Sequence, residues 1–133
     1  MTAKEGFEKV TPGGPFGEAF GAVYFNKQSK TLGFRVAQNH LNPLNVCHGG
    51  AMATFADYQL AVVKMSDVIP IYEKAPTITL TIDYIGGVTL GAWVEMVVTL
   101  ARQTKTMIFT QAVISVDDVM VGRANAIYRH YDG

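Results

Sequence analysis

Hydrophobic and polar residues alternate along most of this chain, except in one long apolar stretch near its middle. Before that stretch, the alternation over 21–26 and 31–37 predicts two short strands, and the polar residues between them predict a hairpin turn. After it, four longer alternating segments predict further strands, at 76–85, 91–102, 105–116 and 119–131. Short polar turns would join the last three strands into a meander.

The apolar stretch, residues 49–65, carries almost no charge and predicts one long helix. A helix that is apolar on every side is usually buried. Residues 66–75 are expected to be a connection. Residues 1–20 are weakly patterned, and Phe16 and Phe20 are expected to anchor them to the core.

Six strands and one apolar helix bury one another most economically when the sheet wraps around the helix. The expected fold class is therefore α+β, with an antiparallel sheet of about six strands around one long central helix. The length of the chain suits a single domain over 1–133.

The third predicted strand is rich in threonine and isoleucine and is expected to divide them between its faces. One face would carry Thr77, Thr79, Thr81 and Asp83, and the other Ile78, Leu80, Ile82 and Tyr84. Because a sheet wrapped around a helix keeps open edges, this strand is a candidate to pair with a second copy of itself. We therefore expect a homodimer.

Composition narrows the possible partners. Eleven basic residues balance eleven acidic ones, which argues against nucleic acid or an anionic membrane as the main partner. The single cysteine cannot form an internal disulfide. The start of the chain lacks the apolar run of a signal peptide, and no apolar window is long enough for a membrane span. These features lead us to expect a soluble cytoplasmic protein.

Asp57 is the only carboxylate between residues 49 and 63. A carboxylate on an apolar helix costs free energy unless a partner satisfies it, so Asp57 requires an explanation. The helix begins at His48-Gly49-Gly50, without Ser, Thr or Asp immediately before its first turn. Free amides behind two glycines suit an oxygen atom that gains negative charge. Alternatively, Asn45 or water caps this end of the helix.

Helix geometry separates these two features. Nine residues at about 100° each put His48 and Asp57 on opposite sides of the helix and roughly 13 Å apart along its axis. Asp57 therefore cannot act at the helix start of its own chain. It can act at that of a partner if two helices lie side by side in opposite directions, which would give two equivalent sites per dimer.

The spacing of the polar residues resembles a known signature. Asn42, five residues, His48-Gly49-Gly50, six residues and Asp57 are similar to the motif of hot-dog-fold thioesterases of the phenylacetate-degradation, or PaaI-like, type. The similarity extends from about residue 21 to residue 131. It includes Ala75-Pro76-Thr77 and Gly122-Arg123-Ala124.

The resemblance implies a hot-dog fold and a dimer whose sheets join edge to edge, often paired into a tetramer. It also implies hydrolysis of acyl-CoA thioesters without a metal or another cofactor. By resemblance, the Gly49 amide polarises the thioester carbonyl with help from Asn42, and Asp57 of the other subunit activates water or attacks directly. Thr77 would orient the water, and His48 would fix the turn or contact the thioester. Gly50 and Tyr58 are expected to bind substrate.

Several residues have plainer interpretations. Asn45 stands where the family commonly has glycine, and asparagine tolerates a left-handed backbone. Cys47 beside His48 could be a thiol nucleophile, but adjacent residues point in different directions at a helix start and no acidic residue follows to orient the histidine, so Cys47 is expected to be a small buried residue. His40 and His130 lack partners at metal-ligand spacing. Tyr58, Gln59 and Val62 would line an acyl pocket or pack in the core. Arg102, Lys105 and Arg123 would meet the phosphates of CoA or remain solvated.

Two other functions remain open on the same fold. An acyl-CoA hydratase or dehydratase would need a histidine beside the aspartate, and the helix has none from Ala51 onward. A non-catalytic acyl-CoA-binding module would be expected to have a degraded motif, whereas Asn42, His48, Gly49 and Asp57 are all present. The sequence does not distinguish the acyl group, nor whether Asp57 is a base or a nucleophile.

Overall fold

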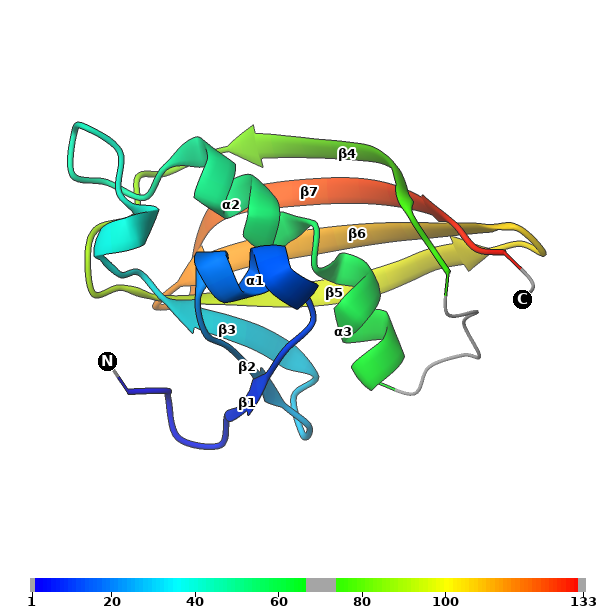
Figure 1. Cartoon of the computed structure of the whole chain (residues 1–133), viewed down its shortest axis with the longest axis horizontal. Coiled ribbons are helices and arrows are strands. Elements are labelled where there is room, and N and C mark those ends of the chain that lie inside the picture. The colour runs from blue at the N-terminus through cyan, green and yellow to red at the C-terminus, as the bar shows by residue number, and fades with distance from the viewer. Residues whose placement is uncertain (1, 67–73, 132–133) are drawn as a thin grey trace.

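The computed structural model describes residues 2–66 and 74–131. One antiparallel sheet of seven strands carries the helices on one face (Figure 1). The strands are β1 (Glu8–Val10), β2 (Val23–Asn26), β3 (Thr31–Arg35), β4 (Thr77–Tyr84), β5 (Trp93–Gln103), β6 (Met107–Val116) and β7 (Val119–Arg129). Their order across the sheet is β1-β2-β3-β5-β6-β7-β4. All six predicted strands are present, and β1 is an addition.

The N-terminal segment contains more structure than its weak pattern predicts. β1 pairs with β2, and the helix α1 (Gly14–Phe20) follows it. A three-residue strand is too short to reveal an alternation, and glycine and proline weaken the helical signal of α1. Phe20 is buried and its ring lies 5.1 Å from that of Phe34, as expected for an anchor. Phe16 is 67% exposed, so the expectation that it also anchors the segment is wrong.

The central helix is bent where the sequence predicts a continuous one. It consists of α2 (Gly49–Ala56) and α3 (Gln59–Met65), with Asp57 and Tyr58 between them. The backbone carbonyl of Asp57 accepts a hydrogen bond of 3.1 Å from the Tyr128 hydroxyl. That bond supplies a partner to a carbonyl at the break, where the regular helical ladder is interrupted.

β4 lies at one edge of the sheet and pairs with β7 alone among the described strands. The register of this pair shifts between Thr77 and Thr79, which indicates a β-bulge. The Thr77 hydroxyl bonds to Asp57, on the helix-bearing side of the sheet. The prediction that Thr77 shares a face with Thr79, Thr81 and Asp83 is therefore wrong, because a bulge interrupts the period of two.

The core lies between the sheet and α2–α3. Its fully buried members include Phe34, Phe55, Met96 and Ile114, and α3 contacts β5 and β6. The short 3₁₀ helix η1 (Gln38–His40) leads from β3 toward the start of α2. The predicted connection at 66–75 falls largely on 67–73, outside the described residues. Within the described residues, no helix is both long and apolar enough to cross a membrane.

Candidate active site

Asp57 lies at the break between α2 and α3, where its half-buried carboxylate meets two hydroxyl groups. Its Oδ1 atom accepts hydrogen bonds from Thr77 Oγ1 at 2.9 Å and from Tyr128 Oη at 3.2 Å. Both donors act on the same oxygen, and neither bonds to Oδ2. The arrangement fixes the carboxylate and leaves its second oxygen without a partner among the described residues, available to a ligand.

Tyr128 was not among the site residues predicted from the sequence. It is 2% exposed, and burial raises the pKa of its hydroxyl, with the neighbouring Asp57 carboxylate as a further cause. Tyr128 therefore stays protonated at neutral pH and remains a hydrogen-bond donor to Asp57. A tyrosine on the core face of a strand carries no sequence signal that distinguishes this contact from ordinary packing.

A cavity of about 420 Å³ opens beside the Asp57 carboxylate. Apolar side chains of α3, Leu60, Ala61 and Met65, form part of its lining, and Thr77 and Tyr128 lie on the other side. Lys64 is exposed and adds one positive charge. The cavity thus combines an apolar wall with a single fixed carboxylate, which is the usual form of a small-molecule site.

His48 caps the start of α2. Its Nδ1 atom accepts a 2.7 Å hydrogen bond from the Gly50 amide, so the expectation of an uncapped helix start is wrong. The prediction took only Ser, Thr and Asp as possible N-caps, whereas an imidazole nitrogen caps this helix. Because Nδ1 accepts, the proton of the neutral ring lies on Nε2, in an exposed side chain. The capped Gly50 amide is not available to a substrate.

The Gly49 amide donates no hydrogen bond to any described residue, as expected for the first position of a helix. The Gly49 carbonyl accepts a hydrogen bond of 2.8 Å from the Tyr84 hydroxyl. Gly49, Gly50 and Tyr84 line a separate cavity of about 550 Å³. Of the predicted amides at this helix start, Gly49 is the one with free donor capacity.

Asn42 holds the turn that precedes the helix. Its side-chain carbonyl oxygen accepts bonds from the Leu44 amide at 2.9 Å and the Val46 amide at 3.2 Å. Asn45 has φ +63°, the left-handed conformation that asparagine tolerates in place of glycine. The Asn42 oxygen is thus occupied by backbone, and its NH₂ group is the part left to meet a ligand.

The predicted site residues therefore form two groups. Asp57, Tyr58 and Thr77 line one cavity, and Gly49 and Gly50 line another. Eight residues of helix, about 12 Å along a straight axis, separate Gly49 from Asp57. Within one chain these two groups do not meet.

The remaining candidates have structural positions. Gln59 and Val62 are buried in the core, and Gln59 accepts a 2.7 Å bond from Thr110, so neither lines the Asp57 cavity. Cys47 is buried, and that burial raises the pKa of its thiol to about 11. Arg123 pairs with Asp83 at 2.8 Å, and both are exposed.

His40 is buried and bonds through its Nε2 atom to the Phe20 carbonyl at 2.6 Å. His130 is also buried. In the described part of the chain, no cluster of three His, Cys, Asp or Glu residues could hold a metal ion. Arg102 and Lys105 are exposed.

Comparison with known proteins places this geometry in a family. The family model of the thioesterase superfamily matches residues 44–122, which is more than half of the chain. This chain belongs to the thioesterase superfamily. The match includes the turn before α2, the whole helix and the edge strand β4, so the predicted family and the predicted class of enzyme, a thioesterase, are confirmed.

Individual relatives are similar over about three quarters of the chain or more. The Pseudomonas aeruginosa protein named "Putative esterase PA0474" is 22% identical over 131 residues, which cover 96% of this chain and 97% of that protein. A variant of the phenylacetic acid degradation protein PaaI from Thermus thermophilus has a TM-score of 0.67 at 17% identity, covering 76% of this chain and 84% of that one.

A hypothetical thioesterase protein from Streptococcus pneumoniae, solved with coenzyme A, has a TM-score of 0.68 at 17% identity. It covers 94% of this chain and 84% of that one. At such identities these likenesses establish the fold, and the predicted hot-dog fold is confirmed.

Proposed function

We propose that this thioesterase hydrolyses acyl-CoA thioesters and that Asp57 performs the chemical step. The observation that carries the proposal is the Asp57 carboxylate, held on one oxygen by Thr77 and Tyr128 at the mouth of a partly apolar cavity. The structure of the Streptococcus pneumoniae thioesterase with coenzyme A supports the choice of thioester.

Asp57 has two possible roles in the reaction. As a general base, its free Oδ2 takes a proton from water while the water oxygen attacks the thioester carbon and the thiolate of CoA leaves. As a nucleophile, Oδ2 attacks that carbon itself and displaces the thiolate of CoA, and water then hydrolyses the mixed anhydride. In both routes the carbonyl oxygen gains negative charge, which requires a donor.

The Gly49 amide is the proposed donor, in a site shared by two chains. It lies at the positive end of α2 and is unpaired within the described residues. Gly49 and Asp57 lie in different cavities of one chain, so the proposed site combines Asp57 of one protomer with Gly49 of the other.

β4 provides a route to that combination. It is an edge strand whose Thr77 contacts Asp57 near its start and whose Tyr84 contacts Gly49 at its end. If two copies of β4 pair antiparallel about a two-fold axis, the start of one strand lies beside the end of the other. Each Asp57 then approaches the partner's helix start, and two equivalent sites result.

The test is turnover of a panel of acyl-CoA and aryl-CoA thioesters, measured by release of CoA. We expect Asp57→Asn to reduce kcat by about 10²-fold or more, since it keeps the shape and the hydrogen bonds but cannot accept a proton or attack. Asp83→Asn is the matched control, because Asp83 is an exposed carboxylate paired with Arg123. Full activity in Asp57→Asn would exclude the proposed role.

Mixed dimers test the shared site. Gly49→Pro removes the amide donor, and proline is tolerated at the first position of a helix, where the extended backbone of His48 permits it. Asp57→Asn and Gly49→Pro chains should each be nearly inactive alone. After subunit exchange, one of the two sites in a mixed dimer should regain both groups, and the absence of any recovery would contradict the shared arrangement.

A single turnover in heavy-oxygen water separates the two roles of Asp57. With enzyme in excess, the base route places the label in the released acid, whereas attack of water on the Asp57 carbonyl of an anhydride places it in the protein. A hydratase function has no comparable support, because no histidine lines the Asp57 cavity in the described part of the chain.

A further inference from the structure

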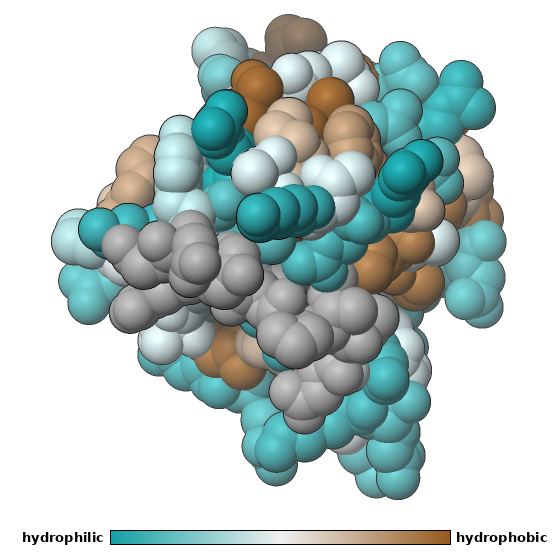
Figure 2. Space-filling model, turned by 90° about the vertical axis from the view of Figure 1, so that its right-hand side faces the viewer, coloured by the Kyte–Doolittle hydropathy of each residue, from teal (hydrophilic) through white to brown (hydrophobic). Residues whose placement is uncertain are grey.

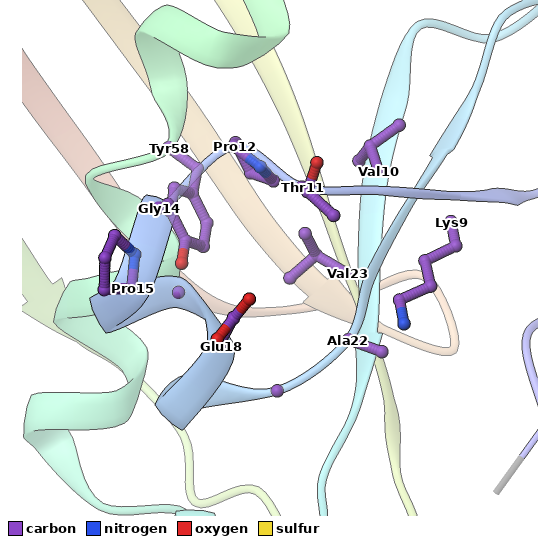
Figure 3. Close-up of a pocket in the computed structure, with 13 residues that line it drawn as sticks. Lys9, Val10, Thr11, Pro12, Gly14, Pro15, Glu18, Ala22, Val23 and Tyr58 are labelled. Carbon is purple, nitrogen blue, oxygen red and sulfur yellow. The ribbon is translucent and has the colours of Figure 1, made fainter.

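A third cavity, of about 630 Å³, lies between α1, the segment before it and the start of β2 (Figure 3). Its walls are mainly apolar and are formed by side chains of Val10, Pro12, Ala22 and Val23. Two exposed charged residues, Lys9 and Glu18, also line it, and Figure 3 shows Glu18 extending from α1. Its volume falls in the usual range of small-molecule sites.

This α1 cavity adjoins the Asp57 cavity. Thr11, Pro12 and Tyr58 line both of them, so the two spaces meet at these three residues. An acyl group whose carbonyl carbon lies at Asp57 would pass these three residues to reach the α1 cavity. Without the α1 cavity, the Asp57 cavity of about 420 Å³ would have to hold both the acyl group and the thioester.

Tyr58 carries an unpartnered hydroxyl at this junction. The residue is 8% exposed, and its ring packs edge-on against Phe20 at a centroid distance of 6.0 Å. Its hydroxyl makes no hydrogen bond to any described residue, although Thr77 and Tyr128 nearby are both bonded. A buried hydroxyl destabilises the folded protein unless a ligand or water forms a hydrogen bond with it.

Two glycines of the α1 segment make room for this hydroxyl. A Cβ atom at Gly13 would lie 2.6 Å from Tyr58 Oη, closer than atoms can approach, and one at Gly17 would lie 3.4 Å away. Figure 3 shows the ring of Tyr58 directed toward α1, with Pro12 and Gly14 beside it. The segment thus leaves the hydroxyl uncovered where the two cavities meet.

We propose that the α1 cavity binds the distal part of the acyl group, and that the Tyr58 hydroxyl binds an oxygen atom on that group. The substrate class is then a medium-chain acyl-CoA that carries a hydroxyl or keto oxygen along its chain. This inference rests on the proposed acyl-CoA thioesterase function and adds the acyl specificity to it. Burial, with the nearby Asp57 charge, raises the pKa of Tyr58, so its hydroxyl remains a donor at neutral pH.

Gly17→Ala tests the cavity. The added methyl group enters at ordinary contact distance from Tyr58, and alanine is the better helix former, so the variant should fold at least as stably. We expect kcat/KM for octanoyl-CoA to fall roughly tenfold relative to acetyl-CoA, the scale of an overpacked methyl group. Ala19→Ser, on the exposed side of the same helix, should leave the ratio unchanged. An unchanged ratio in Gly17→Ala would overturn the proposed acyl cavity.

Tyr58→Phe tests the oxygen. The wild-type enzyme and Tyr58→Phe are each assayed with octanoyl-CoA and with its monohydroxylated derivatives, which differ in the position of the hydroxyl. The wild type should prefer at least one of these derivatives over octanoyl-CoA, and Tyr58→Phe should lose that preference. A site that hydrogen-bonds a substrate hydroxyl discriminates strongly against the analogue without it. The absence of a preferred isomer, or the same preference in Tyr58→Phe, would overturn the role of Tyr58.

Calorimetric binding keeps this inference separate from the proposed reaction. If the wild type turns over no thioester, the proposed function fails, while binding of octanoyl-CoA to it and to Gly17→Ala still tests the cavity. Weaker binding in Gly17→Ala supports the cavity, and equal affinity overturns it. If thioesters are hydrolysed but the chain-length ratio does not change, the function stands and the cavity assignment fails.

Discussion

The Tyr128 hydroxyl contacts both the side chain and the backbone of Asp57. It lies 3.2 Å from Oδ1 and 3.1 Å from the backbone carbonyl oxygen. Thr77 donates its hydrogen bond to the same carboxylate oxygen and not to that carbonyl. Tyr128 therefore supports both the direction of the carboxylate and the bend of the helix, whereas Thr77 supports the carboxylate alone.

Tyr128→Phe and Thr77→Val separate these contributions. We expect kcat to fall in both variants, by roughly tenfold for each lost hydroxyl, because Asp57 is less firmly held. The free energy of unfolding should fall by about 1–2 kcal/mol in Tyr128→Phe and much less in Thr77→Val, since Tyr128 is buried and Thr77 is exposed. Steady-state kinetics and urea denaturation measure the two effects. Unchanged kcat in both variants would show that the hydroxyl groups do not position Asp57.

Cys47 gives a prediction at alkaline pH. Burial raises the pKa of its thiol from 9.0 to about 11, so the folded protein holds a proton that the unfolded chain releases. The free energy of unfolding should therefore decrease as pH rises from about 9 toward about 11. Cys47→Ala should show a smaller decrease when urea denaturation is followed over this range. At pH about 8, a disulfide reagent should label Cys47 in urea but hardly in the native protein.

Among single residues, those that stand out from their surroundings in the sequence could be predicted, and those of a type usual for their position could not. Asp57 was recognisable because a carboxylate on an apolar helix needs a partner, and Thr77 followed from the family motif. Tyr128 and the imidazole cap at His48 were not recognisable, because tyrosine in a strand and histidine in a turn are usual. The role of Tyr128 depends on a contact between distant parts of the chain, whereas the His48 cap is a local contact with Gly50.

Among the elements, the connection between α1 and the turn before α2 depends on His40. Its ring bonds to the Phe20 carbonyl at the end of α1, and its own backbone carbonyl accepts a 2.7 Å bond from the His48 amide. His40 Nδ1 accepts the Ala37 amide at 2.9 Å, which leaves no free nitrogen on the neutral ring. Protonation of His40 would remove that acceptor.

The pH dependence of stability tests this connection. Burial lowers the pKa of His40 from 6.5, so the unfolded chain binds a proton at a pH where the folded protein does not. The free energy of unfolding should therefore decrease as pH falls below 6.5. His40→Asn should be less stable at about pH 7.5 but should lose less stability on going to about pH 5.5. An equal loss in the two proteins would show that another group controls this range.

Element types were predicted more successfully than their details. Long alternating segments revealed β4 to β7 because each has one face on the core. The bend at Asp57 and the bulge at Thr77 were not predicted, since a hydrogen bond from Tyr128 and a register shift against β7 are tertiary features. β1 and α1 are too short, or too rich in glycine and proline, for a periodic signal.

For the molecule as a whole, the proposed site makes activity depend on association of two chains. Specific activity should fall on dilution, because a separated protomer retains Asp57 but loses the partner's Gly49 amide. The fall should occur at the concentration where light scattering detects dissociation. Constant specific activity in a protein shown to be monomeric would contradict a site built from two chains.

The surface contains apolar residues that association could cover. On β4 and just beyond it, Ile78, Tyr84 and Ile85 are more than half exposed, and farther from the edge Val97 of β5 and Val113 of β6 are exposed as well. Figure 2 shows hydrophobic patches among hydrophilic residues on one side of the molecule. The homodimer and the pairing of dimers into a tetramer both stay predictions, and the apolar surface of the edge strand is where the homodimer would form.

The bulge in β4 has a consequence for how this chain can change over evolutionary time. Loop insertions elsewhere would leave the site intact, but one residue inserted between Thr79 and Tyr84 would reverse the alternation before it and, with the bulge kept, turn Thr77 away from Asp57. Tyr84, beyond the bulge, would keep its contact with Gly49. One inserted codon would thus uncouple the two ends of the strand, so the length of β4 is constrained along with the side chains on it.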